Sequence, residues 1–251
     1  MRLADRIALV TGAGSGFGEG IARRYAEEGA IVVVNDVDAA SAKRVAAAIG
    51  AAGGRASAIA GDVSRDDDVR RLVEHALATF GDLHVIVNNA GTTHRNQPML
   101  DVSEAEFDRI YAVNVKSLFL MARHAVPHFR RKRDGVLITI ASTAGVRPRP
   151  GLTWYNGSKG AAIVTSRSMA VELAPDNVRV NVINPVAGET GLLAQFMGED
   201  TPAMRAKFVA SIPLGRLSKP SDVATAAVFF ASDEAAFVTG ACLEVDGGRC
   251  V

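Results

Sequence analysis

The sequence contains two cysteines, Cys242 and Cys250, and both lie near its C-terminal end. They form no C-x-x-C pair, and a secreted disulfide framework needs more cysteines at closer and more regular spacing. The sequence also lacks a hydrophobic run of the about 18 residues that a membrane span requires. The apolar run Ile7–Val10 near its start is too short for a signal peptide. We therefore expect a soluble protein of a reducing compartment, the cytoplasm, with no membrane partner.

Neither sign of charge is in excess, since 28 Lys and Arg residues stand against 27 Asp and Glu residues. A dedicated nucleic-acid-binding protein usually has a strongly basic surface, so this balance argues against nucleic acid as a partner. A chain with 48% hydrophobic and 22% charged residues is too apolar for intrinsic disorder. Its 251 residues allow one large domain or two small ones. No linker, repeat or low-complexity segment divides it, so we expect a single domain over residues 1–251.

Short apolar runs rich in β-branched residues recur along the chain, and each is nearly continuous rather than alternating. This pattern is typical of strands that helices cover on both faces. Alanine-rich stretches with apolar residues at helical spacing separate the runs. The alternation of strand and helix predicts an α/β domain with a parallel sheet. The predicted strands are Ile7–Val10, Ile31–Val34, Ala56–Ala60, Leu83–Val87, Val136–Ile140, Val178–Ile183 and Cys242–Val245.

Capping residues predict where some of the helices begin and end. Ser103 and Glu106 fit a capping box that begins a long helix running toward Arg133. Gly29 and Gly50 each stand where a helix-ending glycine is expected. His124 and His128, four residues apart on that long helix, have a spacing that suits zinc if a third ligand converges. No H-E-x-x-H pattern accompanies them, so we expect no metal.

A glycine-rich loop follows the first strand and begins the first helix. Gly12 permits the tight turn, Gly16 lets the backbone approach a pyrophosphate, and Gly18 allows close packing of helix and strand. The helix N-terminus also favours an anion. The position between a strand and a helix raises this loop above an ordinary turn. We therefore predict a dinucleotide site that includes Ser15 and Phe17 of the same loop.

Asp36 follows the second strand, 18 residues after Gly18. A carboxylate about 20 residues beyond the glycine loop is expected to bind the hydroxyls of the adenosine ribose. It would repel a 2′-phosphate, and the loop carries Ser15 and no basic residue, so NAD is favoured over NADP. The alternative is that Asp36 caps the next helix, but Asp38 is placed to do so. We assign Asp36 and Val37 to the cofactor site.

These residues, together with others along the whole chain, resemble the short-chain dehydrogenase/reductase family. The match includes the loop Thr11–Gly18 and four residues that correspond in order and spacing to the family's catalytic tetrad, Asn114, Ser142, Tyr155 and Lys159. The resemblance implies a doubly wound Rossmann fold with a seven-stranded sheet in the order 3-2-1-4-5-6-7, and a homotetramer. It also assigns further residues to the cofactor: Asp62, Val63, Asn89, Ala90, Gly91, Tyr155, Lys159, Pro185, Gly188 and Thr190.

Two residues depart from the family pattern. Val186 stands where a glycine usually follows Pro185, and Gly188 stands where an aliphatic residue is usual. By the resemblance, the Gly188 backbone N–H contacts the nicotinamide carboxamide.

Tyr155 and Lys159 are four residues apart, so they share one face of a helix. A free tyrosine has a pKa near 10 and is a poor base at neutral pH. An ammonium about 4 Å away, at an effective dielectric constant near 20, is worth about 4 kcal/mol. This is enough to lower the tyrosine pKa toward about 7. By resemblance, Tyr155 is then the acid–base, Lys159 also holds the nicotinamide ribose, Ser142 orients the substrate, and Asn114 positions a water linking Lys159 to solvent.

Basic residues on two loops beside the predicted tetrad are candidates for binding an anionic or polyhydroxylated substrate. They are His94, Arg95, Arg147 and Arg149. The alternative for the arginines is a solvated surface or a contact with another subunit. The segment of about residues 190–211 resembles the family's substrate lid.

The sequence thus predicts an NAD-dependent enzyme that interconverts a secondary alcohol and its ketone, or a sugar and its lactone. A sugar or polyol substrate, as in glucose 1-dehydrogenase, fits Asp36 and the polar loops best. An NADPH-dependent 3-oxoacyl-carrier-protein reductase is the enzymatic alternative. A catalytically silent NAD-sensing or scaffold module is the alternative of another class, but such modules usually lose the Tyr or the Lys, and this chain keeps both.

Overall fold

The computed structural model describes residues 1–251, and a single seven-stranded sheet runs through its centre in the order β3-β2-β1-β4-β5-β6-β7. All neighbouring strands are parallel. This confirms the doubly wound sheet and its predicted order. The strands are β1 (Ile7–Val10), β2 (Ile31–Asp36), β3 (Arg55–Ala60), β4 (Val85–Asn88), β5 (Gly135–Ile140), β6 (Val178–Pro185) and β7 (Cys242–Val245).

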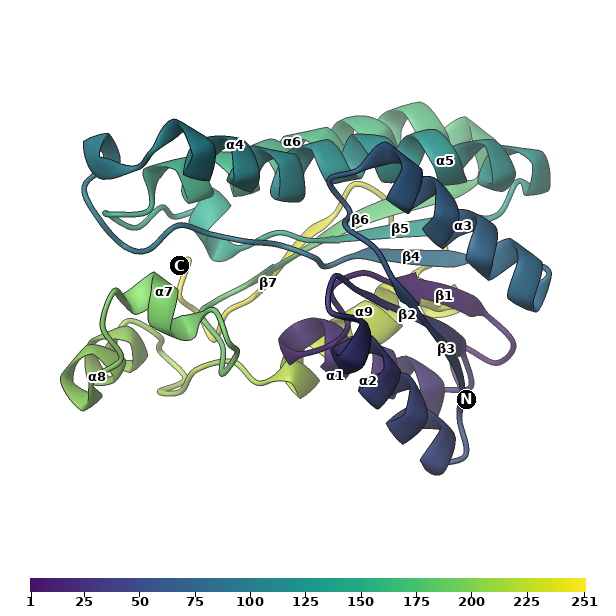
Figure 1. Cartoon of the computed structure of the whole chain (residues 1–251), viewed down its shortest axis with the longest axis horizontal. Coiled ribbons are helices and arrows are strands. Elements are labelled where there is room, and N and C mark those ends of the chain that lie inside the picture. The colour runs from purple at the N-terminus through teal and green to yellow at the C-terminus, as the bar shows by residue number, and fades with distance from the viewer.

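Helices cover both faces of this sheet (Figure 1). In Figure 1, α1, α2 and α9 lie below the sheet, whereas α3, α4, α5 and α6 lie above it. The two short helices α7 and α8 lie beside the C-terminus, away from both layers. The helices are α1 (Gly16–Glu27), α2 (Ala39–Ala51), α3 (Asp66–Phe80), α4 (Glu104–Tyr111), α5 (Ser117–Lys132), α6 (Thr153–Leu173), α7 (Leu193–Met197), α8 (Pro202–Ala210) and α9 (Pro220–Ala231).

The alternation of side chains along each strand divides the hydrophobic core into two layers. On β1, Ala8 and Val10 belong to the layer beneath α1, α2 and α9, whereas Ile7 and Leu9 belong to the layer beneath α3, α5 and α6. Both sets are buried because both faces are covered, as expected for a parallel sheet. Only the edge strands β3 and β7 carry exposed residues. The two layers hold the strands rigidly, and so they fix the positions of the strand ends.

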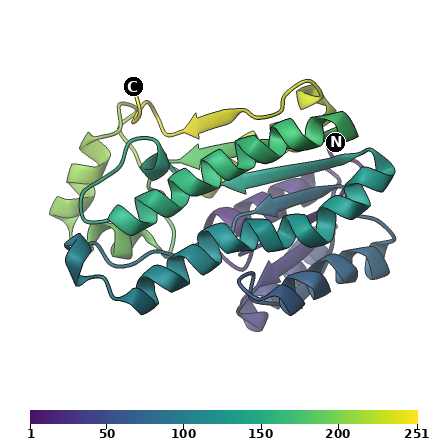
Figure 2. The same ribbon diagram turned by 90° about the horizontal axis from the view of Figure 1, so that it is seen from above.

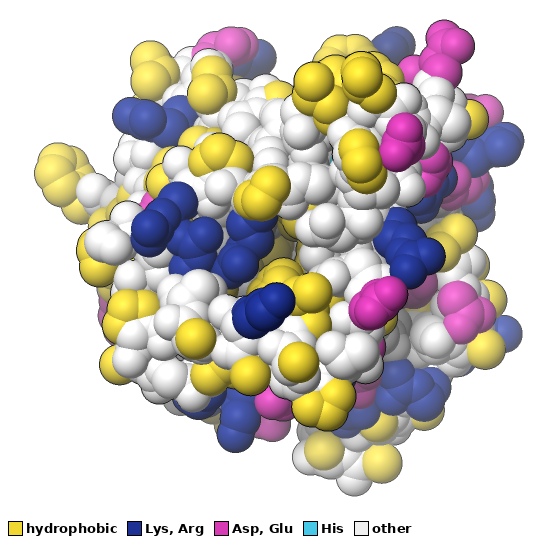
Figure 3. Space-filling view, turned by 90° about the vertical axis from the view of Figure 1, so that its left-hand side faces the viewer, with side chains coloured by type: hydrophobic (Ala, Val, Ile, Leu, Met, Phe, Trp, Pro, Cys, Tyr) yellow, Lys and Arg dark blue, Asp and Glu magenta, His cyan; other side chains and the backbone are white.

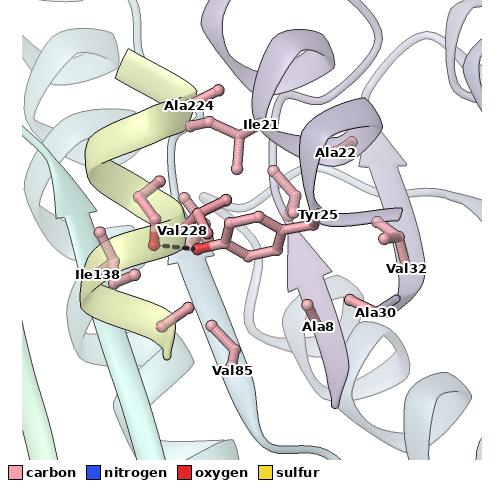
Figure 4. Close-up of a cluster of buried hydrophobic side chains, with 14 of the residues drawn as sticks. Ala8, Ile21, Ala22, Tyr25, Ala30, Val32, Val85, Ile138, Ala224 and Val228 are labelled. Atoms are coloured by element: carbon pink, nitrogen blue, oxygen red, sulfur yellow. Dashed lines mark hydrogen bonds between the residues drawn. The ribbon is translucent and has the colours of Figure 1, made fainter. Parts of the chain in front are cut away.

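Helices α1 and α9 pack closely against each other, with the Tyr25 side chain between them (Figure 4). The Tyr25 ring is fully buried, and its hydroxyl donates a hydrogen bond of 2.9 Å to the Ala227 carbonyl oxygen. A buried hydroxyl requires such a partner. This contact joins the glycine-loop helix to a helix about 200 residues later in the chain, and it thereby stabilises the first βαβ unit.

Several predicted boundaries shift by a few residues. Strand β2 continues to Asp36 and β6 continues to Pro185, so residues assigned to the site lie at strand ends. The prediction that Gly50 ends a helix is wrong, because Gly50 lies inside α2. The chain leaves that helix at Gly53, which adopts a φ of +83°. Gly29, with a φ of +92°, follows the end of α1 as predicted.

The long helix predicted from Ser103 toward Arg133 is present, but it is not regular. Ser103 and Glu106 form the predicted capping box. Helix α4 then passes into a π-helical turn at Ala112–Lys116 before α5 begins. Such turns insert one extra residue and are frequent at functional sites. Helix α5 runs beside α6 on the outside of this layer (Figure 2).

No helix is both long enough and apolar enough to cross a membrane. The structure contains no group of three His, Cys, Asp or Glu side chains arranged to hold a metal ion. The two histidines at zinc-compatible spacing bond different carboxylates: His124 lies 2.9 Å from Asp66 Oδ1, and His128 lies 2.8 Å from Asp82 Oδ1.

Candidate active site

One cavity of about 590 Å³ opens at the carboxyl ends of the central strands. In doubly wound sheets, ligands bind in the crevice at this edge. Its lining combines the glycine loop, the ends of β2, β4, β5 and β6, the start of α6, and the segment that contains α7 and α8. Residues from opposite ends of the sequence therefore form one continuous surface.

The glycine loop has the close packing that its spacing predicts. Gly12 and Gly16 adopt φ angles of +60° and +57°, which side-chain-bearing residues rarely adopt. Gly18 lies beneath the loop and does not line the cavity. A Cβ atom at Gly18 would clash with the Gly12 carbonyl oxygen and with Asn89 Nδ2. Gly18 therefore serves the approach of α1 to the strands rather than direct contact with a ligand.

The Asp36 carboxylate lies against the glycine loop at the end of β2. Its Oδ2 atom accepts a hydrogen bond of 2.9 Å from the Gly14 N–H, and its Oδ1 atom accepts one of 3.0 Å from the Asp38 N–H. A Cβ atom at Gly14 would lie 2.7 Å from Asp36 Oδ2, so the glycine makes room for the carboxylate. Asp38 caps α2 by accepting from the Ala40 and Ser41 N–H groups. The helix-cap alternative for Asp36 is therefore wrong.

Sequence reasoning missed Arg44, which lies beside this carboxylate region. Its guanidinium donates a 2.6 Å hydrogen bond to the Gly14 carbonyl oxygen and forms a 2.7 Å ion pair with Glu19. A basic residue is therefore present near the glycine loop, but a carboxylate already neutralises it. The sequence signal that could have identified Arg44 is its position in the helix that follows Asp36.

Most of the residues that were assigned to the cofactor line this single cavity. Asn89 also ties two parts of it together, because its Nδ2 atom donates to the Thr11 and Gly12 carbonyl oxygens at 2.8 and 3.0 Å. Of the predicted set, only Gly18 is absent from the lining. The lining members are Gly12, Ser15, Gly16, Phe17, Asp36, Val37, Asp62, Val63, Asn89, Ala90, Gly91, Tyr155, Lys159, Pro185, Gly188 and Thr190.

The unusual Gly188 has a physical partner in the glycine loop. A Cβ atom at Gly188 would clash with the Phe17 ring and would lie 2.7 Å from Ser218 Oγ. The missing side chain therefore makes room for Phe17. Val186, the other departure, is buried in a small apolar cluster with residues of α7 and α8. Both departures are thus accommodated by packing around the loop.

Ser142, Tyr155 and Lys159 meet on one wall of the cavity. Ser142 follows β5, and its Oγ atom accepts from the Ala144 N–H at 3.1 Å. Tyr155 and Lys159 share one face of α6, as predicted, with the Lys159 ammonium 5.9 Å from the centre of the Tyr155 ring. That ammonium donates a 2.9 Å hydrogen bond to the Ile140 carbonyl oxygen. The end of β5 and a single turn of α6 therefore bring these three side chains together.

The expected lowering of the Tyr155 pKa toward 7 is wrong for this structure. Burial raises the pKa of Tyr155 to about 12, and the nearby Ser142 hydroxyl opposes this shift. Burial also disfavours the charged form of Lys159, and it lowers the pKa of this ammonium to about 8. The prediction assumed an ammonium about 4 Å from the phenol at an intermediate dielectric constant, whereas burial dominates the pKa of both groups here. Tyr155 is therefore a neutral phenol at pH 7 and is ready to donate a proton.

Asn114 lies behind this wall rather than in it. Its Oδ1 atom accepts from the Thr92 N–H at 2.8 Å, and its Nδ2 atom donates to Ser158 Oγ at 2.9 Å. The π-helical turn directs this buried side chain toward both partners. Gly91 keeps the space between Asn114 and Lys159 open, since a Cβ atom there would lie 3.3 Å from Lys159 Nζ and 3.5 Å from Asn114 Oδ1.

Of the four basic substrate candidates, only Arg149 lines the cavity. His94 is buried and its Nδ1 atom lies 2.8 Å from the Arg95 carbonyl oxygen. Arg95 lines a separate hollow and donates to the Gly198 carbonyl oxygen. Arg147 donates to the Arg249 carbonyl oxygen at 2.5 Å. These three side chains therefore lie outside the cavity.

Apolar side chains line the part of the cavity near Arg149, and two of them, Phe196 and Phe208, belong to the predicted lid. Leu152 packs against Tyr155 and Phe196. The centres of the Tyr155 and Phe196 rings are 5.1 Å apart, and the Arg149 guanidinium lies 4.5 Å from the centre of the Phe208 ring. Phe196 and Phe208 belong to α7 and α8, within the segment expected to be a lid. The part of the cavity beside Tyr155 is therefore mainly apolar.

The cavity fits a nicotinamide dinucleotide. The glycine loop offers backbone N–H groups without side chains in the way, and Asp36 offers a carboxylate at the ribose position. Lys159 and Tyr155 line the same cavity, and Lys159 lies beside Gly91. A phenol, a hydroxyl and an ammonium on one wall provide a proton donor and hydrogen bonds for a carbonyl oxygen.

Comparisons with known proteins agree with this geometry. A family model described as enoyl-(acyl carrier protein) reductase matches residues 12–249. The 4-formylbenzenesulfonate dehydrogenase of Comamonas testosteroni is 54% identical over 250 residues, 99% of this chain and 99% of that protein. The cis-4-hydroxycyclohexanecarboxylate dehydrogenase of Sinomonas cyclohexanicum is 38% identical over 245 residues, 98% of this chain and 96% of that protein.

Two solved structures resemble this chain over nearly its whole length. The crystal structure of 3-ketoacyl-(acyl-carrier-protein) reductase from Brucella melitensis, complexed with NADH, has a TM-score of 0.93 at 49% identity and covers 99% of this chain and 100% of its own. The 7α-hydroxysteroid dehydrogenase complexed with NADH and 7-oxo glycochenodeoxycholic acid also has a TM-score of 0.93, at 37% identity. This match covers 98% of this chain and 95% of that chain. The chain therefore belongs to the short-chain dehydrogenase/reductase family, and it is an oxidoreductase that acts on CH–OH groups with a nicotinamide cofactor.

Proposed function

We propose that the protein interconverts a secondary alcohol and its ketone, using NAD rather than NADP. The observation that carries this proposal is that Ser142, Tyr155 and Lys159 share one cavity with the glycine loop and Asp36. The cavity therefore combines proton chemistry at one end with a dinucleotide-binding loop at the other. A catalytically silent module has no need of a buried Tyr–Lys pair.

The residues of the chain act on the substrate oxygen. In the reductive direction Tyr155 donates its phenolic proton to that oxygen, and in the oxidative direction it accepts the proton. The Ser142 hydroxyl hydrogen-bonds the same oxygen and holds it beside the phenol. The Lys159 ammonium stabilises the deprotonated form of Tyr155 and binds ribose hydroxyls. The bound cofactor supplies or takes up the hydride.

The preference for NAD rests on charge at the end of β2. Asp36 lines the cavity there, and its carboxylate would repel a 2′-phosphate. The guanidinium of Arg44 donates to the Gly14 carbonyl oxygen of the loop, but Glu19 already pairs with it at 2.7 Å. Retaining a 2′-phosphate would require both that ion pair and the position of Asp36 to change.

The apolar wall beside Tyr155 favours a ring-bearing alcohol over a sugar or polyol. Leu152, Phe196 and Phe208 line this part, and none of them hydrogen-bonds a hydroxyl. The names of the relatives support this reading, since they refer to formylbenzenesulfonate and hydroxycyclohexanecarboxylate. The sugar or polyol substrate stays a prediction, now less favoured by the lining of the cavity.

The alternative is a reductase for 3-oxoacyl groups. It is supported by the 49% identity to the 3-ketoacyl-(acyl-carrier-protein) reductase, whose structure contains NADH. Ketone reduction with NADPH at neutral pH, together with slow oxidation of all ring alcohols, would favour this alternative.

The cofactor preference is tested by titrating the protein with NADH and NADPH and following the nucleotide fluorescence. We expect NADH to bind at least tenfold more tightly, and Asp36→Ala to reduce that ratio by weakening NADH and admitting NADPH. Asp67→Ala, which removes an exposed carboxylate at the start of α3, is the matched control and should leave the ratio unchanged. Tighter binding of NADPH to the unaltered protein would contradict the assignment of Asp36.

A further inference from the structure

We propose that Arg149 forms an anion-binding subsite in the substrate part of the cavity, and that the substrate is a ring alcohol bearing a carboxylate or sulfonate group. This inference rests on the proposed function, because it concerns the substrate of the same site. It adds the recognition element that the apolar wall lacks.

The Arg149 side chain is held in place from several sides. Asn156, the residue after Tyr155, donates from Nδ2 to the Arg149 carbonyl oxygen at 2.8 Å. The guanidinium stacks on the Phe208 ring at 4.5 Å and donates to Ser211 Oγ at 3.1 Å. The backbone of Arg149 is therefore tied to the catalytic helix, and its head group lies on the lid segment. An anion bound by the Arg149 guanidinium would therefore lie between the catalytic helix and the lid segment.

No carboxylate side chain balances the charge at this position. The contacts of the Arg149 guanidinium are a neutral hydroxyl and an aromatic face. Two more arginines lie close enough to repel it, Arg147 and Arg249. Arg147 donates only to the backbone oxygens of Arg249 and Val251. The Arg149 guanidinium therefore has no carboxylate partner.

Arg249, whose charge acts on Arg149, has donors that no protein group satisfies. The residue is only 9% exposed, and its Nε and Nη1 atoms are buried without a hydrogen-bond partner. A buried charged group normally has its hydrogen bonds satisfied, because leaving them unmade costs several kcal/mol. Basic side chains also gather beside a hollow on the face that carries α7 and α8 (Figure 3). Positive charge is therefore concentrated on this side of the molecule.

The electrostatics of Arg149 agree with this geometry. Burial, followed by the charges of Arg249 and Arg147, lowers the pKa of Arg149 to about 10. Arg149 therefore remains charged at neutral pH, at a cost that an anion would offset. Charge-assisted hydrogen bonds to a planar carboxylate or to a sulfonate suit a guanidinium well.

The wall between Arg149 and the phenol defines the body of the substrate. Phe208 contacts Arg149, and Phe196 contacts Tyr155, so apolar rings extend from the guanidinium to the reacting hydroxyl. A molecule that spans the two ends needs an apolar middle, a hydroxyl for Tyr155 and an anion for Arg149. A polyhydroxylated chain would leave its middle hydroxyls without partners along this wall.

The test compares matched pairs of secondary alcohols that differ only in charge. One pair is 4-(1-hydroxyethyl)benzoate and its methyl ester, and the other is 4-(1-hydroxyethyl)benzenesulfonate and its sulfonamide. We expect the anionic member of at least one pair to have a kcat/KM about 10- to 100-fold higher, the range expected for charged hydrogen bonds. The preferred pair then identifies the anion. Equal kcat/KM values within both pairs would overturn the proposal.

Variants assign this preference to the guanidinium. Arg149→Met should reduce the anionic-to-neutral ratio at least tenfold, mainly through KM, and Arg149→Lys should restore part of it. Arg205→Met is the control, since Arg205 lies on α8 and pairs with Asp200 at the surface. A ratio that Arg149→Met leaves unchanged would overturn the proposal even if the anion is preferred.

Calorimetry with the cofactor-free protein separates this proposal from the proposed function. Benzoate and benzenesulfonate are titrated into the unaltered protein and into Arg149→Met. Binding that weakens at least tenfold in the variant supports the subsite, even if no alcohol in the panel is oxidised. Absence of binding by both anions, with turnover of the neutral alcohols, overturns the subsite and leaves the dehydrogenase intact.

Discussion

At the scale of single residues, Gly18 controls how closely the glycine loop packs on the strand ends. The Gly12 carbonyl oxygen and Asn89 Nδ2 occupy the space that a Cβ atom at Gly18 would need. Gly18→Ala should lower the free energy of unfolding by about 1–3 kcal/mol, the usual cost of overpacking. It should also weaken NADH binding, because the loop must shift. Urea unfolding and nucleotide fluorescence measure the two effects.

Gly50→Ala is the matched control for that substitution. Gly50 is exposed within α2, and no atom lies within 4 Å of the position of a Cβ. Alanine in a helix is favoured over glycine by about 0.5–1 kcal/mol, so this variant should be slightly more stable than the unaltered protein. Equal destabilisation by both substitutions would contradict the packing role of Gly18.

The buried, charged Lys159 side chain lowers the stability of the folded protein. Burial lowers its pKa to about 8, and its ammonium has one hydrogen bond, to the Ile140 carbonyl oxygen. The unfolded chain therefore holds more protons than the folded one between about pH 8 and 10.5, so stability rises with pH in that window. Below pH 8 the cost is fully present, on the order of 3 kcal/mol.

Lys159→Met should therefore unfold at a higher temperature than the unaltered protein at pH 7, while losing activity. The difference should shrink as the pH rises toward about 10. Thermal unfolding of the cofactor-free proteins at pH 7 and at pH 10 measures it. A variant that is less stable at pH 7 would show that the ammonium stabilises the fold.

Spacing in the sequence predicted those residues whose position follows from one regular element. Tyr155 and Lys159 share a face because four residues make about one helical turn. The position of Arg149 depends instead on how an irregular loop packs against Phe208 of α8, and loop paths leave no periodic signal. The prediction of the Tyr155 pKa was wrong for a similar reason, because the extent of burial depends on tertiary packing.

At the scale of elements, α7 and α8 form the part of the fold that is least anchored. They contain five and nine residues, and they pack on a cluster of six buried residues that is separate from both main layers. Short elements on few buried contacts open more readily than core helices. We expect trypsin to cleave first at Arg205 or Lys207, both exposed on α8.

Mass spectrometry of the first fragments checks this expectation. The exposed Arg131 and Lys132 at the end of α5 provide an internal comparison, because that helix packs in the main core. A first cut at the end of α5 would contradict the assignment of residues 190–211 as a lid.

Element boundaries were predictable where a cap determines them and not where packing does. The capping box at Ser103 and the cap at Asp38 are local, and both are present. The π-helical turn at Ala112–Lys116 has no local signature in the sequence. The partners that Asn114 bonds from this turn, Thr92 and Ser158, are distant in the chain.

At the scale of the whole molecule, the outer face of α5 and α6 carries exposed apolar side chains. Phe119 on α5 is 59% exposed, and Val164 and Val171 on α6 are 64% and 80% exposed. Contiguous exposed apolar residues often indicate an interface. We propose that this face contributes to the homotetramer that the family resemblance implies.

Light scattering during size-exclusion chromatography tests that proposal. The unaltered protein should have four times the 26.3 kDa mass of the chain. Val171→Glu should yield smaller species, since it places a charge in the contact. A monomeric unaltered protein would contradict the proposed assembly.

The overall architecture was the most predictable level, because it depends on many residues together. Strand–helix alternation over the whole chain implied the parallel sheet, and the motifs implied its strand order. The substrate was the least predictable, because it depends on a few side chains from loops and from α7 and α8.

The central claim is that Tyr155 transfers the proton while the rest of the cavity binds the cofactor. Tyr155→Phe keeps the buried ring that contacts Phe196 and Leu152 but removes the hydroxyl. The measurement is kcat/KM for the best alcohol, taken together with NADH affinity, in the unaltered protein and in this variant. For the unaltered protein, kcat/KM for oxidation should rise about tenfold per pH unit up to about pH 8, where Lys159 begins to lose its charge, because the Tyr155 phenol, with a pKa of about 12, must lose its proton. The account predicts a loss of about 100- to 10,000-fold in kcat/KM for the variant, with NADH binding retained. Full turnover by the variant would contradict it.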